Sequence, residues 1–100
     1  MNEYRFKMSQ YKHLVIRKNE GVEVYDDIKS HLQAGEVVII DFSDIDTMTT
    51  FFAKEVFGKL YAEMGAEDFQ TRIKFDKRYL TEDLDLVLRI GIAGAISVSV

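Results

Sequence analysis

Two kinds of hydrophobic spacing alternate along the chain and predict alternating strands and helices. Polar and apolar residues alternate over Tyr4–Met8 and again over Thr71–Phe75, as in strands with one exposed face. Between them, Val37–Ile40 is apolar throughout and is followed by Asp41, which predicts a central strand covered on both faces. Leu14–Ile16 is a further short apolar run, compatible with a second strand or a buried loop.

Three- and four-residue spacing predicts two helices in the middle of the chain. The first runs from about Glu20 to Gln33 and ends at Gly35. The second begins at Thr49 or Thr50, either of which can cap the first free amides with its hydroxyl, and it ends at Gly65. The core-facing residues predicted for the two helices are Val22, Tyr25, Ile28 and Leu32, and then Phe52, Ala53, Val56, Phe57, Leu60 and Met64.

A last helix is predicted after Thr81, because the acidic residues that follow suit the positive end of a helix dipole. This helix is apolar on two opposite sides, with Leu84, Val87, Leu88 and Ala95 on one and Leu86, Ile90 and Ala93 on the other. In a small domain such a helix is either buried twice or paired with another chain, so Leu86 and Ile90 are candidate partner-binding residues.

The tail is compatible with two conformations. Gly91 and Gly94 weaken a helix, whereas Ile96, Val98 and Val100 alternate with serine as in a strand. A strand there could extend the sheet of a neighbouring chain.

This order of elements predicts a single α/β domain over residues 1–100, with a small mixed, partly parallel sheet and about three helices. A hydrophobic content of 47% is enough for one modest core. The absence of cysteine excludes disulfides, thiolate chemistry and cysteine-ligated zinc. The chain has no long apolar run, and its first residues are too charged for a signal peptide, so we expect a cytoplasmic protein that does not bind membranes.

The charge of the chain makes nucleic acid an unlikely partner. The net charge of −4 opposes attraction to phosphate backbones, although basic residues gather between Arg72 and Arg78. That short stretch is typical of the exposed face and end of a strand.

Asp41, Asp44 and Asp46 crowd the loop that follows the central strand. Ligands bind at such carboxyl ends in open α/β sheets, so a magnesium or nucleotide site is one hypothesis for this loop. The alternative is a polar turn that hydrogen-bonds to its own backbone. The spacing of a calcium-binding loop is absent, and no glycine-rich phosphate loop accompanies the three aspartates.

Glu23, Asp27 and His31 recur every four residues and could hold a metal from one helix face. That face lies opposite the apolar one, which favours an ordinary solvent-facing role. With His13 the only other histidine, no nucleophile–base arrangement can be assembled, so we expect no catalytic residues, metal or cofactor.

Phe51 is the more informative residue of the second helix. At about 100° per residue it falls outside the apolar face and shares the outward side with Glu55, Gly58 and Ala62. An exposed aromatic followed by small residues would let another backbone approach closely. These four residues are therefore candidates for partner binding.

The stretch "EVVIIDFSDIDTMTTFFAKEVFGKL", from Glu36 to Leu60, resembles the STAS domain. STAS domains occur in anti-sigma-factor antagonists and in the cytoplasmic parts of sulfate transporters. The stretch is more similar to the STAS-like domains of unknown function found in bacteria and their mobile elements. In those domains a preceding motif with arginine and glycine corresponds to Arg17 and Gly21 here, so the resemblance covers about Arg17 to Phe75.

The resemblance also implies a possible switch at the start of the second helix. The antagonists carry an Asp-Ser-Ser-Gly-Leu motif there, in which one serine accepts phosphate. Aligned without gaps, its Asp and two Ser fall on Thr49, Thr50 and Phe51, and its Gly falls on Phe52. A shift by one residue puts Thr50 at the acceptor position. Thr49 and Thr50 are thus possible phosphoacceptors, although helix capping alone accounts for both hydroxyls.

These observations favour a non-catalytic protein-interaction or regulatory module that docks through the helix around Thr49–Ala62 and through the last helix. The resemblance suggests a kinase-like ATPase or a transcription regulator as partner, and a second copy of the chain is the other candidate. The alternatives are a nucleotide or small-ligand sensor that uses the loop Asp41–Thr50, and a phospho-switch at Thr50.

Overall fold

The computed structural model describes residues 2–14 and 21–98. Within them, strands β1 (Glu3–Lys7), β2 (Val37–Asp41) and β3 (Ile73–Phe75) form a three-stranded sheet in the order β1-β2-β3. The central position of β2 is confirmed. Both strand pairs are parallel, so the sheet in these residues is wholly parallel rather than mixed.

One face of the sheet packs against the hydrophobic core. Tyr4 pairs with Val38 and Phe6 with Ile40, and these side chains point to the side on which the helices lie. The opposite face carries the exposed Arg5 beside a half-buried isoleucine of β2. The expectation that both faces of β2 are covered is therefore wrong for the part of the chain that the structure describes, because Val37 and Ile39 on the opposite face stay partly exposed. The predicted element Leu14–Ile16 lies mostly outside the described residues.

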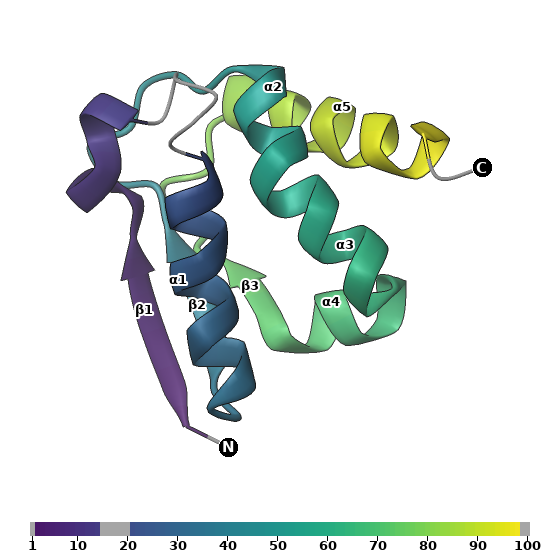
Figure 1. Cartoon of the computed structure of the whole chain (residues 1–100). Helices are drawn as coiled ribbons and strands as arrows, with labels where there is room; N and C mark the ends of the chain where they lie inside the picture. The colour runs from purple at the N-terminus through teal and green to yellow at the C-terminus, as the bar shows by residue number, and fades with distance from the viewer. Residues whose placement is uncertain (1, 15–20, 99–100) are drawn as a thin grey trace.

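Helix α1 (Gly21–Gln33) crosses the sheet in front of β2 (Figure 1). Its buried side is formed by Gly21, Val24, Tyr25, Ile28 and Leu32. Val22, which the spacing assigned to the core, is 50% exposed. It lies about 200° around the helix from Val24, which is buried in the core instead.

The second predicted helix is continuous from Thr50 to Met64 and contains a π turn in its middle. Its parts are α2 (Thr50–Ala53), the π-helical η3 (Lys54–Gly58) and α3 (Lys59–Met64). It stops at Gly65, whose φ of 85° suits glycine. Its inner side joins the core through Phe52, Ala53, Val56, Phe57 and Leu60.

Helix α4 (Ala66–Arg72) was not predicted. It buries one side chain, Phe69, and its other residues are mainly polar, so the sequence shows no apolar period there. Because α4 extends to Arg72, β3 begins at Ile73, two residues later than the alternation indicated.

Helix α5 (Glu82–Val98) packs on the outer side of α2 and η3, away from the sheet (Figure 1). It stays helical through Gly91 and Gly94, so of the two conformations left open for the tail the helix is the one observed up to residue 98. A Cβ added to Gly91 would lie 2.6 Å from the Cβ of Ala53, and one added to Gly58 would lie 2.7 Å from that of Ala95. The glycines therefore let the two helices approach closely.

Candidate functional site

The three aspartates of the acidic loop do not converge. Asp41 is buried, and its Oδ1 accepts a hydrogen bond of 2.8 Å from the amide of Ser43. Asp44 and Asp46 are exposed, and Asp44 turns the chain with a φ of 67°. No group of three potential metal ligands forms among residues 2–14 and 21–98. The hydrogen bond from the Ser43 amide to Asp41 supports the alternative of a polar turn that bonds to its own backbone. Binding of a nucleotide or small ligand at this loop stays a prediction.

Asp41 instead belongs to an ion cluster at the carboxyl edge of the sheet. Nη1 of Arg5 on β1 lies 2.9 Å from Oδ2 of Asp41 on β2 and 2.9 Å from Oδ2 of Asp76, which follows β3. Arg78 adds a second cation, with Nη2 2.7 Å from Oδ2 of Asp76. Arg5 thus links the three strands, and we call Arg5, Asp41, Asp76 and Arg78 the edge cluster.

The edge cluster stabilises the ionised form of both carboxylates. Burial alone would raise the pKa of Asp41, but hydrogen bonds from Ser43 and Arg5 outweigh it, and the pKa lies below its usual value. Hydrogen bonds from Arg78 and then Arg5 hold the pKa of Asp76 well below its usual range. Because each carboxylate is already paired with an arginine, the edge cluster is suited to holding the ends of the three strands together.

Part of the edge cluster could have been found in the sequence. Asp41 and Asp76 each come directly after a predicted strand, and the carboxyl ends of parallel strands meet at one edge. Arg5 gave no such signal, because an alternating strand carries charged residues on its open face as a matter of course.

Thr49 caps the helix that follows the loop. Its Oγ1 accepts a hydrogen bond of 3.0 Å from the amide of Phe52, and its backbone is extended. Thr50 is the first residue of α2 and is exposed. The capping prediction is thereby confirmed for Thr49, and phosphorylation of either hydroxyl stays a prediction.

Phe51 and the three residues predicted to share its outward face do not all lie on one exposed side of the helix. Phe51 is 46% exposed and Ala62 is exposed, but Gly58 is buried against α5, and the Cβ of Glu55 faces Gly21 of α1. The π turn adds one residue to the helix and rotates everything after it by roughly 100°. The placement of Gly58 on the outward face is therefore wrong.

The two-sided character of α5 is confirmed. Leu84 and Leu88 are buried on η3 and its neighbours, whereas Leu86 is 57% exposed and Ile90 is 50% exposed. On α2, Phe51 lies about 200° around the helix from Ala53, which contacts Gly91 of α5. Phe51 therefore points roughly away from α5 and belongs to a separate surface. We call Leu86, Ile90 and Ala93, with the ion pair between Asp85 and Arg89 beside them, the α5 outer face.

The parallel sheet, the loop and the capped helix after β2 have a counterpart among known protein families. The family described as "STAS-like domain of unknown function" matches residues 20–77, more than half of the chain. The chain belongs to this family. No curated protein and no solved structure matches the STAS-like domain described here. The match ends before α5, so the α5 outer face lies outside the region that matches the family.

No helix in the described parts of this STAS-like domain combines the length and the apolar character needed to cross a bilayer.

Glu23, Asp27 and His31 do not form a three-residue metal site among the described residues, although Nε2 of His31 lies 3.7 Å from Oδ1 of Asp27. The His31 ring stacks on Tyr4 at 3.7 Å between centroids, and its Nδ1 lies 2.7 Å from Oε1 of Glu36. Asp27 accepts a hydrogen bond of 2.5 Å from the hydroxyl of Tyr11, which raises the pKa of Tyr11 to about 12. Two of the three residues are thus engaged in contacts that attach α1 to β1 and to the segment after it.

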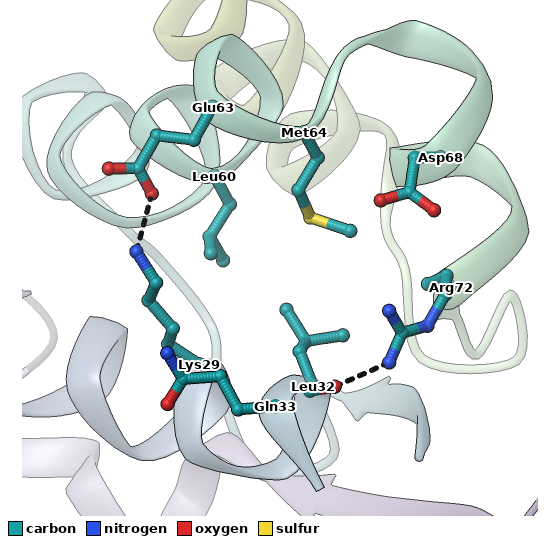
Figure 2. A pocket seen from close by; sticks show the side chains of 8 residues that line it. All are labelled: Lys29, Leu32, Gln33, Leu60, Glu63, Met64, Asp68 and Arg72. Atoms are coloured by element: carbon teal, nitrogen blue, oxygen red, sulfur yellow. Dashed lines mark hydrogen bonds and ion pairs between the residues drawn. The ribbon is translucent and has the colours of Figure 1, made fainter. Parts of the chain in front are cut away.

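An open pocket of about 390 Å³ lies between the end of α1 and the pair α3 and α4 (Figure 2). Its wall holds Lys29, 3.3 Å from Glu63, and Arg72, whose Nη2 donates to the carbonyl of Leu32 at 2.6 Å. Arg72 thereby satisfies a backbone carbonyl at the end of α1. The Nε of Arg72 is buried and has no hydrogen-bond partner among the described residues. With Asp68 as the fourth charge, the wall has two cations and two anions and does not favour a ligand of either sign.

Proposed function

We propose that this STAS-like domain is a non-catalytic protein-interaction module of the bacterial cytoplasm that docks through the α5 outer face. The observation that carries the proposal is the exposure of Leu86 and Ile90, one helical turn apart, on a helix whose other side fills the core. Adjacent large apolar side chains that stay half exposed in a small domain are typical of a contact surface.

Two of the titratable residues that could have supported an enzyme or sensor are engaged in contacts within the fold. Asp41 is bound by Arg5 and Ser43, and His31 is held between Tyr4 and Glu36. Their contacts tie secondary-structure elements together, which supports a module that works through its surface.

The α5 outer face is a better docking surface than the start of α2. Phe51 is exposed, but Gly58, which was to let a partner approach beside it, is covered by α5. On α5 the two large residues and the small Ala93 lie on one side of a regular helix. The resemblance to antagonist STAS domains suggests a kinase-like ATPase or a transcription regulator as the partner, with a second copy as the other candidate.

The test is co-purification from the native host, with a tagged chain produced beside an untagged copy. We expect the wild type and Phe51→Asp to retain the same protein in comparable amounts, and Ile90→Asp to lose at least about 90% of it, because a buried unpaired charge disfavours an apolar contact. Circular dichroism verifies that both variants fold. Equal retention by Ile90→Asp and the wild type, or no retention by any of the three, would contradict the proposal.

A further inference from the structure

The α5 outer face carries an ion pair along one of its two edges. Nε of Arg89 lies 2.9 Å from Oδ2 of Asp85, one turn earlier, and the two side chains are 77% and 39% exposed. With Leu86 as reference, Ile90 and Ala93 lie within about 40° around the helix, whereas Arg89 and Asp85 lie about 60° and 100° to one side. The apolar centre is thus flanked on that side by one cation and one anion.

We propose that the α5 outer face binds the same face of a second copy of this chain, with the two α5 helices antiparallel. The proposal rests on the proposed function and names its partner. In an antiparallel pair with the two-fold axis near Val87, corresponding edges of the two helices meet. Asp85 then lies level with Arg89 of the partner subunit, because each is two residues from the axis.

The distribution of charge along α5 favours the antiparallel arrangement of the two helices over the parallel one. Glu82, Asp83 and Asp85 make the first turn acidic, whereas residues 91–98 carry no charge. A parallel pair would place the acidic turns side by side, at a cost from like-charge repulsion. An antiparallel pair separates them and brings each next to the uncharged end of the other helix.

The apolar centre fits the same arrangement. Leu86 would lie near the axis, and Ile90 one turn further out on either side, so four large side chains would cover one another. With the axis near Val87, the two α5 helices overlap over residues 82–92, a length of about 16 Å, so this helix pair gives an interface below the standard size and a dissociation constant of roughly 10–100 µM.

The experiment uses complementary charge variants and sedimentation equilibrium at about 1–500 µM, a range chosen to bracket this affinity. Asp85→Arg makes the edge wholly cationic, and Arg89→Asp makes it wholly anionic. We expect each variant alone to dimerise at least about tenfold more weakly than the wild type, because like charges meet across the axis. An equimolar mixture of the two should regain wild-type affinity, since opposite edges then face each other.

A double variant with Asp85→Arg and Arg89→Asp controls for local effects on the helix. It restores both the pair within one chain and the pair between chains, so it should dimerise like the wild type. A wild type that stays monomeric at 500 µM, or single variants that dimerise as well as the wild type, would overturn the inference. If the wild type is monomeric while Ile90 is still needed to retain a foreign protein in the co-purification, the inference fails and the proposed function stands.

Discussion

We expect Gly91→Ala to lower the free energy of unfolding by about 3 kcal/mol and Tm by roughly 10–20 °C. The added Cβ would lie 2.6 Å from the Cβ of Ala53 and 2.8 Å from the backbone nitrogen of Lys54. Backbone atoms cannot rotate away as a flexible side chain can, so α5 must separate from α2 and η3. Thermal and urea unfolding followed by circular dichroism measure the change.

Gly94→Ala is the matched control in the same helix. Among the described residues, a Cβ there would meet only the Cδ of Lys54, at 3.8 Å, which is an ordinary contact. Alanine favours helix over glycine, so we expect this variant to gain about 0.5–1 kcal/mol. Equal effects of the two substitutions would mean that α5 does not approach α2 and η3 as closely as described.

We expect Asp41→Asn to cost about 1–3 kcal/mol at pH 7, because it removes the ionised partner of Arg5 from a buried position. The effect should shrink in acid. The pKa of Asp41 is lower in the folded chain than its ordinary value of 3.8, so the folded state favours the ionised form. Its contribution is complete above the ordinary pKa and is lost as the pH falls through 3.8 and below.

Urea unfolding at pH 7, 5, 4 and 3 tests this pH dependence. The wild type should lose stability towards pH 3 more steeply than Asp41→Asn, so the two curves converge. Asp44→Asn is the control from the same loop, since Asp44 is exposed and asparagine tolerates its positive φ. A difference between Asp41→Asn and the wild type that stays constant from pH 7 to pH 3 would show that the edge cluster does not bind Asp41 as an anion.

Local patterns were enough to predict the elements whose burial follows a regular period. The continuous apolar run placed β2 at the centre, and threonine with its neighbours placed the start of α2 to within one residue. The double apolar character of α5 was likewise visible, because helix geometry alone separates Leu86 and Ile90 from Leu84 and Leu88. Each of these predictions depends on residues that are close in sequence.

The features that were missed depend on contacts between distant segments. Gly58 turned away from Phe51 because a π turn shifts the phase of the helix, and no residue type marks such a turn. Gly91 looked like a helix breaker until its contact with Ala53 showed why no larger residue fits. Arg5 acquires its role only when three strands from different parts of the chain bring two carboxylates to it.

The central claim is that the α5 outer face, and not the start of α2, is covered by another protein in the cell. The chain has no cysteine, so a single introduced thiol reports on one position. The measurement is the rate of maleimide labelling of Ile90→Cys and Phe51→Cys, in the native host and in dilute purified protein.

The ratio of the two rates cancels differences in reagent concentration between cell and buffer. Because Ile90 and Phe51 are similarly exposed in the isolated chain, the purified variants should react at comparable rates. In the cell, we expect labelling at position 90 to be at least about tenfold slower relative to position 51, as burial in an interface excludes the reagent. The same ratio in cell and buffer would contradict the account, as would selective protection of position 51.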